Sequence, residues 1–231
     1  MQEKTMTASE SYILRFSAWA PGINGAAEWD EWANDKRNIS HCAKGPEISF
    51  TDPMFRRRLS QISKMTVQVV HDLLPIGDNV KIFFISFRGE LSRQFQINKM
   101  LIEEKTLSPA AFSLSVFNAP AALASMAFGL KGGYSAIYPG NDSFAAGIEA
   151  AEAALFSSLA EELVLVYADE EPPSEYKSLF DECPPPAAFG LLLSRASGSS
   201  CVPLSSVKEY GNKPLDFLKR IFASGAIHVS S

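Results

Sequence analysis

The stretch KGGYSAIYPGNDSFAAGIEAA, residues 131–151, predicts a strand, a tight turn and a helix in immediate succession. The β-prone run 134–138 meets Pro139 and Gly140, and a polar trio then opens an Ala-rich helix. Free backbone N–H groups and the helix dipole favour negative charge at such a helix start, and enzymes place nucleophiles there. The residue at this turn is Asn141. The segment therefore has the layout of an active site without a nucleophile.

Composition is typical of a soluble globular protein. The 231 residues are 46% hydrophobic and 20% charged, and the net charge of −5 argues against nucleic-acid binding. Three widely spaced cysteines form no CxxC pair and lie at no metal-ligand spacing from a histidine, so we expect reduced thiols and no metal or cofactor. The sequence shows no signal peptide, and apolar runs such as 163–168 are too short to span a membrane. We therefore expect a cytoplasmic protein.

Hydrophobic periodicity and turn residues predict alternating strands and helices. Strands are expected at 12–18, 80–87, 134–138, 162–169 and 187–196. Helices are expected at 52–74, 92–106, within 107–133, at 142–159 and at 214–225, with a short Trp-containing helix within 19–37. The segment 170–186, which has five prolines and several acids, is expected to be a mobile excursion.

This alternation predicts an α/β fold with a mixed sheet that is covered on both faces, because the central strands are apolar without interruption. The helix expected at 142–159 carries small residues around much of its circumference. Such a helix suits close packing against several layers. We expect it to be a buried central helix, between two sheets or between this chain and another.

Five ordered motifs resemble one known family. They are RRRLSQISKM (56–65), FISFRGE (84–90), LSPAAFSLSVFNAPAALASMAFGLKG (107–132), DSFAAGIEAAEAAL (142–155) and PLDFLKRIFASG (214–225). Together they resemble the N-terminal half of a β-ketoacyl synthase, which has the thiolase fold. The stand-alone members of this family occur with bacterial aryl-polyene and related type II fatty-acid or polyketide clusters. The resemblance implies one ketosynthase-like N-terminal domain over 1–231.

The resemblance also assigns a position to the turn. Lys131-Gly132 matches the Arg-Gly that precedes the nucleophile strand, and Asn141 falls where ketosynthases carry the catalytic Cys. Chain-length-factor subunits are similar in lacking that Cys. The resemblance therefore implies a non-condensing member of the superfamily.

Other catalytic groups of the family have no counterpart in the motifs of this chain. Ketosynthases take two histidines and a lysine from a C-terminal half, and the expectation is that this chain ends before that half. His41, His71 and His228 lie in no ketosynthase histidine motif, and Phe117 stands where relatives often have His. Condensation by this chain alone is therefore not expected.

The residues around the turn leave two hypotheses open. Asn141, Asp142, Ser143, Phe117 and Asn118 are candidate ligand contacts, since an Asn amide can hydrogen-bond a polyketide carbonyl or a pantetheine amide. Ser143 fits an N-cap and fails the Gly-x-Ser-x-Gly pattern, and an acid such as Asp142 is common in a first helical turn. The rival hypothesis is a small acyl-thioester transferase or hydrolase that uses Ser143 or Asp142.

Partner binding has its own candidate residues. Arg56, Arg57 and Arg58 are either a solvated cationic run or a contact for an acyl carrier protein or another subunit. The strand 134–138 carries no charge, so Ile137 is a candidate interface residue on an unguarded edge. We expect a non-catalytic accessory or scaffold subunit, in a homodimer or in a heteromer with a ketosynthase. An autonomous small-molecule binding module is a third option.

Overall fold

The computed structural model describes residues 10–140, 143–198, 201–208 and 212–224. In these ranges, the sheet contains β1 (Tyr12–Trp19), β2 (Lys81–Ile85), β3 (Tyr134–Ile137), β4 (Glu162–Asp169), β5 (Ala187–Ser194) and β6 (Val202–Pro203). The helices are α1 (Ala26–Ala33), α2 (Pro53–Arg56), α3 (Gln61–Asp72), α4 (Leu91–Glu103), α5 (Pro109–Ser113), α6 (Ala119–Ala127), α7 (Phe144–Ser157), α8 (Ser205–Lys208), α9 (Pro214–Ala223) and the 3-10 helix η1 (Ser174–Leu179). No described helix is long and apolar enough to cross a membrane.

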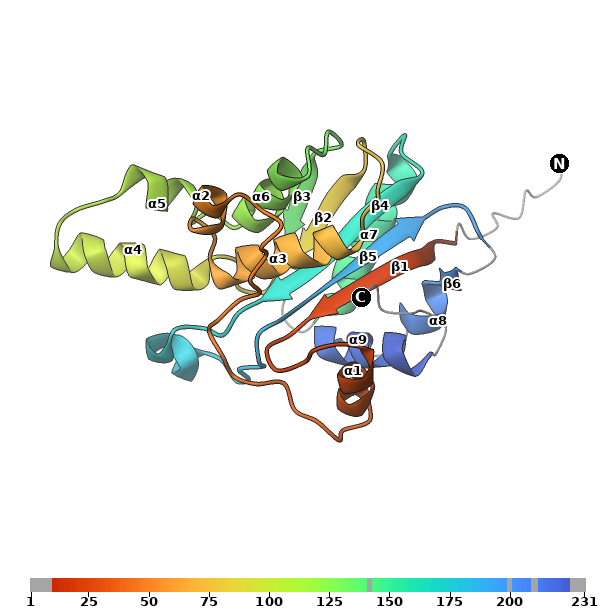
Figure 1. The fold of residues 1–231 in the computed structure, drawn as a ribbon, viewed down its shortest axis with the longest axis horizontal. Coiled ribbons are helices and arrows are strands. Elements are labelled where there is room, and N and C mark those ends of the chain that lie inside the picture. Colours follow the sequence, from red (N-terminus) through yellow and green to blue (C-terminus); the bar gives the residue numbers. More distant parts are fainter. Residues whose placement is uncertain (1–9, 141–142, 199–200, 209–211, 225–231) are drawn as a thin grey trace.

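The sheet is mixed, as the sequence predicts. Its strand order is β3-β2-β4-β5-β1-β6, which leaves β3 at one edge (Figure 1). β2 pairs in parallel with both β3 and β4, and Phe84 lies opposite Ala136 on one side and Val166 on the other. β5 runs antiparallel to both β4 and β1. β2, β3 and β4 run in the same direction, so their carboxyl ends lie side by side along one end of the sheet.

One face of the sheet is covered by α3 and α6 (Figure 1). Ile62, Met65 and Val69 of α3 pack against strand residues such as Phe84 and Val166. The Ser17 hydroxyl of β1 donates to the carbonyl oxygen of Val69 at 2.8 Å. The buried hydroxyl thus gains a partner and fastens β1 to this helix.

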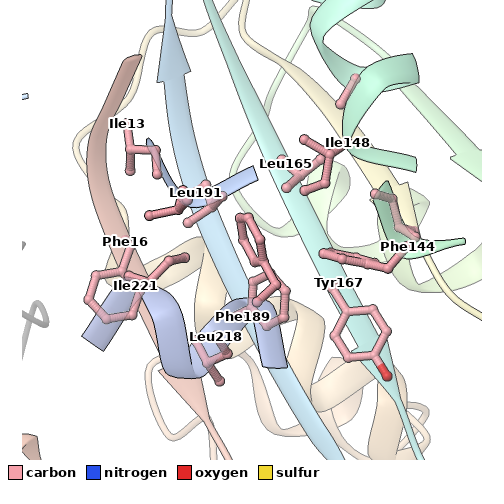
Figure 2. Packing of buried hydrophobic residues seen from close by; sticks show 14 of the residues in the cluster. Ile13, Phe16, Phe144, Ile148, Leu165, Tyr167, Phe189, Leu191, Leu218 and Ile221 are labelled. Atoms are coloured by element: carbon pink, nitrogen blue, oxygen red, sulfur yellow. The ribbon is translucent and has the colours of Figure 1, made fainter. Parts of the chain in front are cut away.

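The opposite face packs against α1, α7 and α9. Figure 2 shows Phe144 of α7 beside Tyr167 of β4 and Phe189 of β5. The Phe144 ring meets both in edge-to-face geometry, at 5.6 Å from Tyr167 and 5.8 Å from Phe189. Ile221 of α9 lies near Phe16 of β1 in the same view. With helices on both faces, the molecule has three layers, which is the architecture of one half of the thiolase fold.

Helix α7 follows the expected turn, and one of its sides is buried within the single chain. Residues at helical spacing, such as Phe144, Ile148, Ala151 and Leu155, are buried against the sheet. On the opposite side Ala146, Glu149, Ala153 and Ser157 are exposed. One side of α7 is therefore buried in the single chain, and the expectation that a second sheet or another chain covers its other side stays a prediction.

One predicted helix is broken in the structure. The segment 52–74 forms α2 and α3, because the Ser60 hydroxyl accepts the N–H of Ser63 at 3.2 Å and starts a new helix. A continuous apolar pattern runs across this cap residue. The segment 107–133, which is expected to begin as a loop and pass into a helix, contains the short α5 in its first part and α6 in its second.

The segment 170–186 is an extended loop that contains η1. Tyr176 packs edge-to-face against Phe95 of α4 at 5.0 Å, and Lys177 pairs with Glu171 at 2.7 Å. Loop 170–186 is therefore tied to α4, and its mobility stays a prediction.

Gly132 provides a test of the packing before β3. A Cβ at Gly132 would lie 2.5 Å from the backbone carbon and 2.6 Å from the oxygen of Val80, whereas a Cβ at Gly198 would meet open space. We predict that Gly132→Ala lowers the free energy of unfolding by about 2–4 kcal/mol. Gly198→Ala, the control, should change it by less than about 0.5 kcal/mol. Urea denaturation measures both, and equal effects would contradict this packing.

Candidate functional site

The candidate site lies where the parallel strands end. The loop 86–90 follows β2, the turn 138–143 follows β3, and the segment after β4 begins at Glu170. Ligands in α/β sheets bind preferentially at the carboxyl ends of the strands. All three loops meet at this edge, so their side chains determine what the site can do.

The turn 138–143, which contains the position that the resemblance assigns to the nucleophile, joins β3 to α7. Gly140 has a φ of +88°, a conformation that a glycine adopts without strain. The Ser143 hydroxyl accepts the N–H of Ala146 at 3.4 Å, and the Phe144 N–H donates to the carbonyl oxygen of Asn212 at 2.9 Å. Ser143 is thus the N-cap of α7, as predicted. Asn141 and Asp142 lie outside the described residues, so their proposed contacts stay predictions.

Aromatic side chains line this edge on both faces of the sheet. Phe87 and Tyr138 meet edge-to-face at 6.0 Å. Phe117 packs 6.3 Å from Phe84, on the α6 side. Gly89 has a φ of +55°, and a Cβ there would lie 2.5 Å from the Phe117 ring. Phe117 therefore fills the space beside the loop 86–90.

The structure separates some of the predicted ligand contacts. Ser143 starts the helix that packs on the same face as Phe83, whereas Phe117 contacts Phe84 on the other face. Asn118 is the N-cap residue of α6, although its side chain accepts no capping hydrogen bond. Phe117 and Asn118 thus approach the sheet edge from the α6 side, and Ser143 approaches it from the α7 side.

A buried carboxylate holds the loop after β2 in place. Asp169, the last residue of β4, accepts the Ser86 hydroxyl at 2.6 Å and the N–H groups of Phe87 and Arg88, both at 2.9 Å. The Ser86 oxygen also accepts the N–H of Gly89 at 2.7 Å. Burial raises the pKa of Asp169, and these hydrogen bonds act in the opposite direction. The conformation of loop 86–90 thus depends on one side chain of β4.

Two further buried acids meet the start of α3. Glu90 is fully buried and accepts the hydroxyls of Ser60 at 2.7 Å and Ser63 at 2.6 Å. Its other oxygen pairs with Arg93 at 3.0 Å. Glu170 accepts the N–H of Ile62 at 3.3 Å. Desolvation on burial, with repulsion from nearby carboxylates, raises the pKa of Glu170 to about 7.

The sequence analysis did not single out Asp169, Glu170 or Glu90. A usable signal was present, because Asp169 and Glu170 directly follow an apolar strand that the pattern placed in the core. Acids at that position end at the edge of a parallel sheet, where they meet neighbouring loops. No group of three or more described His, Cys, Asp or Glu residues could hold a metal ion.

The arginine run begins at the last residue of α2 and continues toward α3. Arg56 donates to the carbonyl oxygen of Ile48 at 3.3 Å and is half-buried, whereas Arg57 and Arg58 are exposed. On the edge strand, Ile137 is half-buried and packs against the core on the α7 side. Arg57 and Arg58 are therefore accessible to a partner, and Ile137 also has a structural role.

The sequence itself matches a family profile. The profile of the family described as "Beta-ketoacyl synthase, N-terminal domain" matches residues 29–215. The chain belongs to this family. The match spans β2 to β5, the turn 138–143 and the buried acids.

Solved ketosynthase structures share the fold. A complex of a ketosynthase with its chain length factor from Xenorhabdus doucetiae contains a chain 26% identical to this one, with a TM-score of 0.69. That alignment covers 82% of this chain and 80% of the other, so the two chains have nearly equal lengths. No curated protein sequence gives a significant match.

Two other complexes show the fold alone, because their identities are low. The ishigamide ketosynthase/chain length factor matches at 13% identity and a TM-score of 0.67, over 84% of this chain and 64% of that one. A type II polyketide acyl-carrier protein in complex with its ketosynthase matches at 15% sequence identity and a TM-score of 0.61. That alignment covers 80% of this chain and 63% of the other. This family member thus covers less than two thirds of both of these chains.

The raised pKa of Glu170 predicts a pH dependence of stability. The folded protein binds more protons than the unfolded chain between pH 4.5 and about 7. The contribution of Glu170 to the free energy of unfolding is therefore fully present below pH 4.5 and falls as the pH rises through this window, by up to roughly 3 kcal/mol. Glu170→Gln should reduce the decline and stabilise the protein at pH 8.

The control for this prediction is Glu103→Gln on the exposed face of α4, which should leave the slope unchanged. Urea midpoints at pH 5, 6.5 and 8 provide the measurement. Equal slopes in the wild type and Glu170→Gln would contradict the assignment.

Proposed function

We propose that this protein is a non-catalytic, cytoplasmic subunit that associates with a ketosynthase in an aryl-polyene or related type II fatty-acid or polyketide pathway. The observation that carries the proposal is the combination of the family's strand-turn-helix with Asn141 at the nucleophile position. Claisen condensation needs a thiolate that accepts the acyl group, and an Asn amide cannot replace it. The chain therefore has the ketosynthase-like fold but no thiol sulfur at position 141.

The surroundings of the turn support a non-catalytic role. A ketosynthase nucleophile works with histidines, and the two described histidines are engaged elsewhere. His41 pairs with Glu171 at 2.6 Å, and His71 stacks on Phe50 at 3.6 Å between ring centroids. The described surroundings therefore offer no histidine base for a nucleophile at this turn.

Three surfaces support association with another subunit. Among the described residues, the edge strand β3 pairs with no strand on one side, and it carries the exposed Tyr134. Large apolar side chains are also exposed on α5 and α6, including Phe112 and Met126. The outer side of α7 is open and rich in alanine. Unpaired edges and apolar patches are typical of interfaces.

A heteromer is the assembly that we favour. The chain of nearly equal length in the Xenorhabdus doucetiae complex belongs to an assembly of a ketosynthase with its chain length factor. A homodimer through β3 is the alternative. The exposed Arg57 and Arg58 are candidate contacts for the acidic surface of an acyl carrier protein, as a third partner of the complex.

The rival function is a small acyl-thioester transferase or hydrolase that uses Ser143 or Asp142. Ser143 acts as the cap of α7, and this engagement favours a structural role for its hydroxyl. Labelling with an acyl thioester, followed by mass mapping, separates the two functions. Only the enzyme would acquire a covalent adduct on this helix start.

The first functional prediction concerns condensation. The purified 231-residue chain should form no carbon–carbon product from malonyl and acyl carrier-protein thioesters, and Asn141→Cys should not restore activity, because a thiol alone lacks the base and the oxyanion donors. Mass spectrometry of the acyl products checks this. Turnover by the wild-type chain without a ketosynthase would refute the proposal.

The second functional prediction concerns the edge strand. The purified chain should form a stable complex with the ketosynthase of its own cluster, and Tyr134→Lys should weaken that complex at least roughly tenfold by placing a charge on the open edge. Leu179→Lys, on the exposed surface of η1, is the matched control and should bind normally. Light scattering coupled to size exclusion gives the stoichiometry.

A wild-type chain that stays monomeric when the ketosynthase is added would contradict the proposed interface through β3. Ile137→Lys is not a suitable variant here, because Ile137 also packs against the core.

A further inference from the structure

A small hollow lies away from the turn 138–143, beside α2 and the first half of α3. We call it the α2–α3 hollow, and its lining residues are Lys44, Gly45, Pro46, Glu47, Ser49, Arg56 of α2 and Lys64 of α3. Its volume is about 350 Å³, near the lower end of the usual range for small-molecule sites. The hollow therefore has room for a small molecule or for one end of a larger one.

The segment 44–49 packs directly against α3. A Cβ at Gly45 would lie 3.2 Å from the Cβ of Lys64 and 3.4 Å from the carbonyl oxygen of Gln61. The side-chain amide of Gln61 also donates to the carbonyl oxygen of Cys42 at 2.6 Å. The side chain of Lys64 therefore leaves α3 beside this segment, where the hollow lies.

Positive charge in the α2–α3 hollow exceeds negative charge. Lys44 pairs with Glu47 at 3.7 Å, and both side chains are exposed. Among the described residues, no carboxylate forms an ion pair with Arg56 or Lys64. The chain as a whole carries a net charge of −5, so this surplus is local. Two cations of the hollow are thus left without a counter-charge.

Arg56 is held in place by a carbonyl group of the segment that it faces. Its Nη1 donates to the carbonyl oxygen of Ile48 at 3.3 Å, and the same oxygen accepts the hydroxyl of Thr51 at 2.8 Å. The other N–H groups of Arg56 are neither buried nor bonded to a described residue, and the same holds for the Lys64 ammonium. Donors of both cations are therefore accessible to a ligand.

An anion with two negative charges fits these donors best. A guanidinium presents its N–H groups in a planar fork that matches phosphate oxygens, and an ammonium adds a point charge with three donors. Ser49 adds a hydroxyl to the lining that bonds to no described residue. A single carboxylate brings one charge and leaves one of the two cations uncompensated.

We propose that the α2–α3 hollow binds the phosphate group of a small phosphate monoester. Arg56 and Lys64 donate to the phosphate oxygens, and Lys44 adds to the positive potential. The proposal uses no residue of the turn 138–143 and needs neither Arg57 nor Arg58. It therefore stands independently of the proposed subunit role.

The first test compares three two- or three-carbon probes on the wild-type chain at pH 7 and constant ionic strength, by NMR titration. Ethyl phosphate carries about 1.5–2 negative charges, whereas ethyl sulfate and propionate carry one each. We expect ethyl phosphate to shift the amide signals of Gly45 and Ser49 in a saturable way and to bind at least roughly tenfold more tightly than the other two. Equal binding of all three probes, or no saturable shift with any, overturns the proposal.

An acidic peptide is the competing occupant of a cationic hollow. Triglutamate, titrated under the same conditions, should bind at least roughly fivefold more weakly than ethyl phosphate, because its carboxylates are spread over three side chains. Equal or tighter binding of triglutamate would show a general attraction for acidic surfaces and would overturn the phosphate assignment.

The last test removes one cation. Lys64→Gln should weaken ethyl phosphate roughly tenfold, because a charged hydrogen bond is lost, whereas Lys64→Arg keeps the charge and should stay within about threefold of the wild type. Lys99→Gln is the control, since it removes the same charge from an exposed residue of α4 that does not line the hollow. Unchanged affinity in Lys64→Gln, with an intact NMR spectrum, overturns the assignment of Lys64.

Discussion

The parallel pairing of β2 with β4 is the constraint on which the rest of the structure depends. Both strands are apolar on both faces, so helices have to cover the sheet from each side. The strands also end together, which brings the loop after β2 beside Asp169 and lets one carboxylate fix three backbone and hydroxyl donors. The positions of the loop 86–90 and of Asp169 thus follow from where β2 and β4 end.

Sequence patterns predicted β4 and β5 well, because burial on both faces leaves few polar residues to blur their ends, whereas the two-residue β6 was missed. β4 occupies 162–169 as expected, and β3 ends at Ile137, one residue before the expected end. The break before Ser60 was missed, since Leu59 and Ile62 continue one apolar pattern across it. Periodicity reports which side faces the core and says little about where the backbone hydrogen bonds stop.

The candidate site was predictable only in part. The motif around Asn141 gave its position, because a strand, a glycine turn and a capped helix are all local. The contacts of Asp169 with Ser86 and of Glu90 with Ser60 join residues 83 and 30 positions apart. A single sequence contains no direct record of such pairs. Acids that follow a core strand look like surface residues until the neighbouring loops are placed.

The strand order also affects how the chain can fold during synthesis. Of the described strands β1 is synthesised first, yet it pairs with β5 and β6, which are made more than 160 residues later. At ordinary translation speeds this delay is on the order of ten seconds. During that time Ile13 and Phe16, both fully buried in the finished fold, remain exposed to solvent. The first strand is therefore a segment that a nascent-chain chaperone would have to shield.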